Sequence, residues 1–309
     1  MKVALIQFAS KYLDIQANLE FTLSKIDEAA AEGAQLIVFG ESWFGGYPAW
    51  IDYCPDAALW DQAATKSVFR KMHENTLSVP SQTLNILQKK AKEKSAALCF
   101  GANELAGPSP GRGTLYNSLF IINEKGELAV HHRKLMPTYT EKLVYGLGDG
   151  AGLKATNLFG YPTTGLICWE HWMPLTRQAL HLQGELIHIA VWPTVHDAHQ
   201  LASRHYAFEG RCFVLAVGQL LRVRDLPEEL SLPDSLSNLP DHWLLRGGSA
   251  VITPQGEYLL EPVFEKEKIL YAEFDPAKAI EEKMTLDVAG HYNRPDVFEL
   301  KVRKDRIRH

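Results

Sequence analysis

Three residues of this chain have side chains suited to nucleophilic chemistry, and each follows a short apolar run. They are Glu41, Lys134 and Cys168. A thiolate is a strong nucleophile, but a free thiol has a pKa of about 8.5, so Cys168 needs a neighbouring base or cation at neutral pH. Glu41 can accept the thiol proton and later activate water, and Lys134 can stabilise charge that develops on the attacked group.

The three residues lie in loop-like segments that contain costly glycine and proline residues, at 39–48, 131–142 and 165–175. Each segment follows an expected strand, and ligands of α/β proteins usually bind beyond the carboxyl ends of strands. At Cys168 we expect a strand-to-helix transition, whose free amides, including that of Trp169, would favour the thiolate. Each residue also has a purely structural interpretation, as a core cysteine, a capping glutamate or a surface lysine.

Strand-like and helix-like segments alternate along the chain. Expected strands are 3–8, 36–39, 96–102, 115–123, 128–134, 163–168, 186–192, 213–217, 249–253, 258–262 and 269–274, and expected helices are 14–33, 56–75, 81–94, 174–183 and 197–210. The longest irregular stretch is 220–248. Because strand–helix units are mixed with hairpins, we expect an α/β protein with mixed sheets. We further expect one domain over 1–309, with a short, basic, solvated tail from about 298 to 309.

The three segments resemble the signature of the nitrilase superfamily of carbon–nitrogen hydrolases, and most closely its nitrilase branch. The resemblance rests on 133–141, on the sequence Cys-Trp-Glu-His at 168–171, and on 290–297, and it spans about 3–297. It implies a four-layer αββα sandwich of two mixed β-sheets flanked by helices. It also implies that subunits pack together through their helices.

The resemblance also implies roles for individual residues. Glu41 would be the general base, Lys134 the stabilising cation, Cys168 the nucleophile, and Glu141 a second, supporting glutamate. The implied reaction converts a nitrile and two waters into a carboxylic acid and ammonia, through a thioimidate and then a thioester. Neither a metal nor an organic cofactor is implied.

Two departures from the family pattern affect these expectations. Gly40 precedes Glu41 where many members have proline, which changes the loop that shapes the pocket. The chain also ends about a dozen residues after Pro295, whereas many nitrilases have a longer tail that helps to build spirals. We therefore expect a homodimer or a short homo-oligomer rather than a long filament.

Aromatic residues in or beside the three segments predict the lining of the substrate pocket. We select Tyr47, Tyr53, Trp169 and Trp192, together with His132 beside Lys134, as substrate-binding residues. Such a pocket suits aryl, arylaliphatic or medium-length aliphatic nitriles, and the sequence does not choose among them. An amidase, a cyanide-degrading hydrolase and a catalytically dead scaffold remain as alternatives.

The composition argues against several other classes of protein. The net charge of −5 offers no basic face for nucleic acid, and no apolar stretch reaches the roughly 18 residues that a membrane span needs. The four cysteines are scattered, which indicates free thiols in a reducing compartment and a cytoplasmic protein. The spacing of His196, His199 and His205 fits no common zinc site. A G-x-S-x-G nucleophile elbow is also absent from the sequence.

Overall fold

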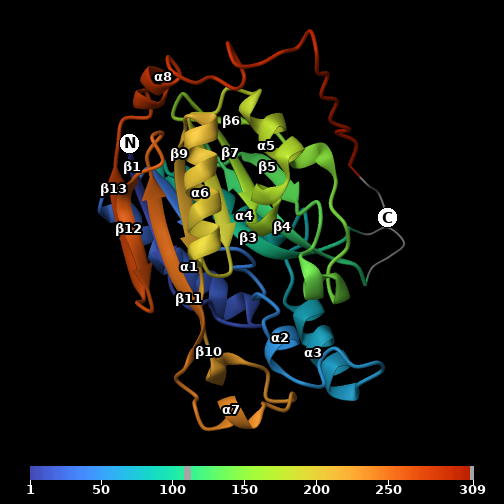
Figure 1. Cartoon of the computed structure of the whole chain (residues 1–309). Coiled ribbons are helices and arrows are strands. Elements are labelled where there is room, and N and C mark those ends of the chain that lie inside the picture. Colours follow the sequence, from blue (N-terminus) through green and yellow to red (C-terminus); the bar gives the residue numbers. More distant parts are fainter. Residues whose placement is uncertain (108–112, 307–309) are drawn as a thin grey trace.

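Two β-sheets form the centre of the protein in a computed structural model that describes residues 1–107 and 113–306 (Figure 1). The first sheet has the strand order β13-β1-β2-β3-β4-β5. Strands β1, β2 and β3 run parallel to one another, and the remaining pairs are antiparallel. The bounds of these strands are Lys268–Glu273, Lys2–Gln7, Leu36–Phe39, Ala97–Leu105, Leu115–Ile122 and Leu128–Arg133, in that spatial order.

The second sheet has the order β10-β11-β9-β8-β7-β6, and β12 pairs with β11. Strands β7, β8 and β9 are parallel, and β8 and β9 pair along their whole length. The bounds are Leu220–Arg222 for β10, Trp243–Ile252 for β11, Phe213–Gly218 for β9, Ile187–Trp192 for β8, Tyr161–Ile167 for β7, Thr156–Leu158 for β6 and Tyr258–Phe264 for β12.

Alternation of side chains along the buried strands explains the layering. In β1, Val3 and Leu5 belong to the core that the two sheets share, whereas Ala4 and Ile6 face the core under α1 (Ile15–Ala31) and α4 (Gln82–Lys94). On the other side, α5 (Pro174–His181) and α6 (Asp197–Gly210) cover the second sheet (Figure 1). The expected four-layer αββα sandwich is therefore confirmed.

Helix caps follow the sequence signals, but one expected helix is too long. Ser81 accepts a hydrogen bond from the Leu84 amide at the start of α4, as an N-cap should. The helix expected over 56–75 is wrong over 56–62, because α3 spans only Ala63–Glu74. Asp61 has a left-handed backbone with φ of 61°, which is incompatible with a continuous helix. Smaller helices are α2 (Trp50–Tyr53), α7 (Asp234–Ser237) and α8 (Lys278–Glu282).

The long irregular stretch expected over 220–248 is also partly wrong. It contains β10 and α7, and β11 already begins at Trp243. Gly247 and Gly248 interrupt the register of β11 with positive φ values of 77° and 83°, so this glycine pair forms an irregularity inside a strand rather than its start.

The described part of the basic tail is anchored rather than wholly solvated. Arg306 donates to the His131 carbonyl at 2.6 Å and pairs with Asp149 at 3.3 Å. Val302 packs against the shared core, and residues 307–309 lie outside the described part. Across 1–107 and 113–306, none of the helices has both the length and the apolar character needed to cross a membrane.

Candidate active site

Four buried side chains meet where strands of both sheets end. Glu41 lies two residues after β2, Lys134 directly follows β5, and Cys168 directly follows β7. Glu141 comes from η1, a 3₁₀ helix over Tyr139–Leu143 that follows the Lys134 segment. All four are at most 3% exposed. Because the two sheets pack face to face, residues far apart in the chain share one site.

The ammonium of Lys134 joins the two carboxylates. Its Nζ donates to Glu41 Oε1 at 3.0 Å and to both oxygens of Glu141, at 2.9 and 2.7 Å. Burial disfavours the ammonium, but its interactions with the acidic groups of Cys168, Glu41 and Glu141 together raise its pKa well above the ordinary value. Glu141 is fixed further, because Oε2 accepts from the Thr138 amide and Oε1 from the Tyr47 hydroxyl. Lys134 therefore remains charged at neutral pH.

Glu41 is placed to act as a base near neutral pH. Burial raises its pKa to about 7, with repulsion from Glu141 acting in the same direction, while Lys134 and the Asn117 amide oppose the rise. Asn117 Nδ2 donates to Oε1 at 2.6 Å. The other oxygen, Oε2, is buried and has no hydrogen-bond partner among residues 1–107 and 113–306. That oxygen is free to accept a proton.

Gly40 allows the Glu41 loop to lie close to the second sheet. A Cβ at Gly40 would stand 2.6 Å from the Gln219 side chain. On its other side the loop runs along β3, where the Gly101 amide donates to the Gly40 carbonyl at 3.1 Å. A glycine at position 40 thus avoids a steric clash with Gln219, and Glu41 still lies in the site.

Cys168 sits on a strained backbone at the start of η3, a 3₁₀ helix over Cys168–Trp172. Its φ is 52°, a left-handed conformation that costs a non-glycine residue about 1–3 kcal/mol. Its Sγ, one Glu41 oxygen and one Glu141 oxygen lie within 4.8 Å of one another. Burial raises the pKa of this thiol well above its ordinary value, and Glu41 adds to the rise; Lys134 and the Trp169 amide act against it. The Trp169 amide thus favours the thiolate in the expected direction, but burial outweighs it, so the thiol needs a base.

Sequence reasoning missed Glu170, which ties two of the site's segments together. Its carboxylate accepts from the Leu135 amide at 2.8 Å and from the Ile167 amide at 2.9 Å. It also pairs with His132 Nε2 at 2.9 Å. Glu170 thus holds the residues next to Lys134 and Cys168 at fixed separation. The sequence offered one signal for it: Glu170 lies two residues after Cys168, within the sequence Cys-Trp-Glu-His at 168–171.

A cavity of about 160 Å³ opens beside Cys168 and Glu141. Tyr47, Tyr53 and Trp169 line it, as does a set not selected from the sequence: Ala49, Asp52, Thr138, Pro193, Thr194, His196, His199, Leu244 and Leu245. Trp192 is fully buried, stacked between the rings of His171 and His199, and is not among the lining residues. His132 is equally buried and faces Glu170 rather than the cavity.

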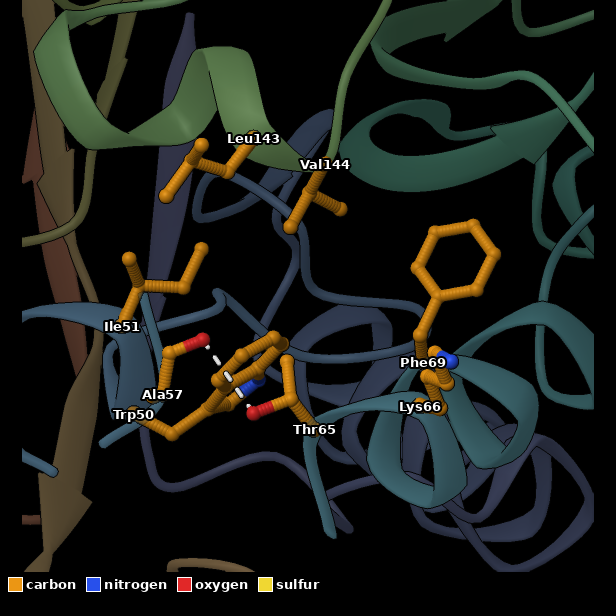
Figure 2. A pocket seen from close by; sticks show the side chains of 8 residues that line it. All are labelled: Trp50, Ile51, Ala57, Thr65, Lys66, Phe69, Leu143 and Val144. Carbon is orange, nitrogen blue, oxygen red and sulfur yellow. Dashed lines mark hydrogen bonds between the residues drawn. The ribbon is translucent and has the colours of Figure 1, made fainter. Parts of the chain in front are cut away.

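A second, larger cavity of about 330 Å³ is separated from the first by the single turn of α2. Figure 2 shows Trp50 and Ile51 of α2 below this cavity, with Leu143 and Val144 of η1 and its C-cap above and Phe69 of α3 beside it. Asp52 and Tyr53, the next residues of α2, line the cavity at Cys168 instead. The larger cavity is mostly apolar and contains none of the four buried site residues.

The only group in the described chain with the spacing of metal ligands is Glu41, Glu141 and Cys168. Both carboxylates already accept hydrogen bonds from the Lys134 ammonium, which supplies the positive charge there. The chemistry available to the group is therefore that of a thiol, a base and a fixed cation: attack on an electrophilic carbon, followed by hydrolysis.

The fold is a four-layer αββα sandwich, and comparisons with known proteins identify the family of this chain. The carbon–nitrogen hydrolase family model matches residues 2–283. An aliphatic nitrilase of Sinorhizobium fredii (strain HH103) is 35% identical over 97% of this chain and 95% of that protein. An aliphatic nitrilase of Rhodococcus rhodochrous is 35% identical over 98% of this chain and 79% of that protein.

Solved structures agree with the fold. The crystal structure of a carbon–nitrogen hydrolase from Helicobacter pylori G27 matches with a TM-score of 0.72 at 18% identity, covering 96% of both chains. The chain belongs to the carbon–nitrogen hydrolase family, and the resemblance to the nitrilase branch is confirmed. It is an enzyme of the nitrilase type.

Proposed function

We propose that the enzyme hydrolyses an organic nitrile to the carboxylic acid and ammonia through a covalent intermediate on Cys168. The observation that carries the proposal is the meeting of Cys168 Sγ with the Glu41 and Glu141 carboxylates within 4.8 Å, next to the Lys134 ammonium. This cluster supplies a nucleophile, a base and a charge-stabilising donor, and two of its members, Cys168 and Glu141, line a small cavity.

The first half of the proposed reaction forms a thioimidate. Glu41 accepts the thiol proton on its unpartnered Oε2 while Sγ attacks the nitrile carbon. The nitrile nitrogen gains that proton from Glu41, and negative charge developing on the nitrogen is stabilised by Lys134 and by the Trp169 amide. One π bond of the carbon–nitrogen triple bond and the S–H bond are broken, and one C–S bond and one N–H bond are formed.

The second half releases the products. Water adds to the thioimidate carbon with Glu41 as base, ammonia leaves, and a thioester remains. A second water, activated in the same way, displaces Sγ and yields the acid. The two waters balance the reaction R–CN + 2 H₂O → R–COOH + NH₃. In this scheme Glu141 holds Lys134 in place and shares its charge.

The cavity supports a small substrate. Its volume of about 160 Å³ is close to that of an apolar cavity of ~150 Å³ known to bind benzene. A short aliphatic chain or a single ring fits this space. Both relatives described above are named aliphatic nitrilases, so we propose a short aliphatic nitrile bound against Tyr47, Tyr53 and Trp169.

Ammonia release from a substrate panel tests the proposal. The panel contains short aliphatic nitriles, phenylacetonitrile, cyanide and the amides that correspond to each nitrile. Cys168→Ala removes the nucleophile, and Cys99→Ala, which truncates an equally buried thiol in the β3 core, is the matched control. We expect ammonia from a nitrile with the wild type and with Cys99→Ala, and none with Cys168→Ala.

Other outcomes would replace the proposal with one of the alternatives. Equal or faster turnover of amides would make the enzyme an amidase, and turnover of cyanide alone would make it a cyanide-degrading hydrolase. Full activity in Cys168→Ala would overturn the covalent mechanism. Inactivity of the wild type on every compound would favour the catalytically dead scaffold.

We also propose a homodimer or short homo-oligomer that packs through α5 and α6. Apolar side chains on these helices are exposed in the single chain, at 70% for Leu175, 64% for Leu201 and 47% for Phe208. Sedimentation velocity tests this, and particles far larger than a tetramer would contradict it. The cytoplasmic location and the single-domain organisation stay predictions.

A further inference from the structure

A chain of buried hydrogen bonds leads away from the nucleophile into the second sheet. His171 Nδ1 lies 2.6 Å from the Cys168 carbonyl oxygen, and His171 Nε2 lies 3.0 Å from His188 Nε2. His188 Nδ1 then meets the Thr164 hydroxyl at 2.7 Å, and this hydroxyl also contacts Glu185 Oε2. The His171, His188 and Glu185 residues are at most 2% exposed, and none of them lines the cavity at Cys168.

The partners determine where the hydrogens lie. A carbonyl oxygen only accepts, so His171 Nδ1 carries the hydrogen and donates it to Cys168. Burial lowers the pKa of His171 well below its ordinary value, so its ring is neutral and Nε2 is an acceptor. The hydrogen between the two rings therefore belongs to His188 Nε2. Without that donor, His171 Nε2 would be a buried acceptor that has lost its partner, which is unfavourable in this orientation of the ring.

Stacking and side-chain hydrogen bonds fix both rings. His188 stacks on Tyr206 with ring centroids 3.7 Å apart, and His171 stacks on Trp192 at 4.7 Å. Beyond them, Glu185 accepts from the Tyr206 hydroxyl at 2.8 Å and pairs with His181 at 2.7 Å. The far end of the chain of hydrogen bonds is thus as firmly held as the end at Cys168.

We propose that His188 is a positioning residue for the nucleophile. It fixes the orientation of His171, whose Nδ1–H holds the Cys168 carbonyl and so stabilises the left-handed backbone that directs Sγ toward Glu41 and Glu141. Since Cys168 adopts this backbone without the freedom of glycine, the conformation persists only where surrounding contacts impose it. The inference rests on the proposed role of Cys168 as nucleophile.

Two substitutions at His188 separate positioning from bulk stability. His188→Gln keeps an N–H donor near the place of Nε2, whereas His188→Met fills similar space with no donor. The first readout is the rate at which iodoacetamide alkylates Cys168 in the folded enzyme, followed by peptide mass spectrometry so that Cys54, Cys99 and Cys212 are scored separately. The second readout is steady-state kinetics, in which kcat and KM are determined separately. Thermal melts establish that each variant is folded.

We expect His188→Met to lower both the alkylation rate and kcat by about tenfold or more, with KM nearly unchanged, because the nucleophile is misplaced while the cavity is intact. His188→Gln should restore most of both rates. Wild-type rates in His188→Met would overturn the proposal, and so would equal losses in the two variants, which would indicate a merely structural role. Alkylation needs no nitrile, so a failure of the nitrilase assignment would leave this test valid and distinguishable.

Discussion

Lys134 Nζ lies 3.0 Å from Glu41 Oε1, although 93 residues separate the two in the chain. The same ammonium also donates to Glu141, so one cation serves two buried carboxylates. Burial is the main reason why the pKa of Glu41 lies at about 7 rather than near 4.5; Lys134 opposes the rise and Glu141 adds to it. Burial and these two neighbouring charges together therefore set the protonation behaviour of the proposed base.

Glu41→Gln should remove the base while preserving the local structure. The glutamine oxygen can still accept from Asn117 and Lys134, so we expect a melting temperature close to that of the wild type. Loss of proton transfer should lower kcat/KM by about 10²–10⁴-fold. Steady-state ammonia release measures the effect, and Glu20→Gln on the exposed surface of α1 is the control. Activity within a few-fold of the wild type would assign the base elsewhere.

The pH dependence of kcat/KM should follow the titration of Glu41. Its pKa is raised to about 7, so below that pH the carboxyl is protonated and cannot accept the thiol proton. We therefore expect kcat/KM to be low in acid and to rise to a plateau as pH passes through about 7.

Asn117→Leu provides a check on that assignment, because the Asn117 amide lowers the pKa of Glu41 by donating to Oε1. Removing this donor should shift the rise of kcat/KM to higher pH. If kcat/KM of Asn117→Leu rose over the same pH range as that of the wild type, a group other than Glu41 would be responsible for the rise.

Lys134→Met should cost stability as well as activity. Two buried carboxylates would lose their shared cation, a type of change that destabilises proteins by about 3–5 kcal/mol. Urea denaturation at pH 8 measures this, and Lys142→Met on the exposed side of η1 is the matched control. Combining Lys134→Met with Glu141→Gln removes one of the two charges, so it should recover part of the stability but none of the activity. If Lys134→Met alone were as stable as the wild type, this account would be contradicted.

Gly148→Ala should disturb Lys134 from outside the site. A Cβ at Gly148 would stand 2.2 Å from the Arg133 carbonyl oxygen and 2.4 Å from that of Lys134, both backbone atoms that cannot rotate away. We expect a destabilisation of about 1–3 kcal/mol together with reduced kcat. Gly107→Ala is the matched control, since a Cβ there meets nothing within 4 Å. Equal melting temperatures for the two variants would refute the steric argument.

The strands and the positions of three of the four buried site residues could be predicted from the sequence for a physical reason. Parallel strands buried on both faces form continuous apolar runs, and polar residues directly after such runs stand out. Glu41, Lys134 and Cys168 each occupy such a position. Glu141 came only from the family resemblance, because nothing in its own neighbourhood distinguishes it from a surface glutamate.

Site residues that lie within buried strands could not be predicted in the same way. Asn117 lies in the middle of β4, where its neighbours indicate only a buried strand, and its contact with Glu41 depends on long-range packing. His188 occupies the same kind of position in β8. Trp192 was selected because it ends a strand, but its ring turns into the interior, where stacking on His171 and His199 is more favourable than exposure.

The single turn of α2 forms a partition between two chambers of the molecule. One helical turn has little stability of its own, so its position depends on what packs against each side. Ile51 and Phe69 touch only the outer, apolar chamber, whereas Asp52 and Tyr53 form a wall of the inner one. Engineering for bulkier substrates thus has a route that spares the inner wall. A smaller residue at Ile51 or Phe69 would leave space in the outer cavity. The turn of α2 could then shift into that space, which would enlarge the cavity at Cys168.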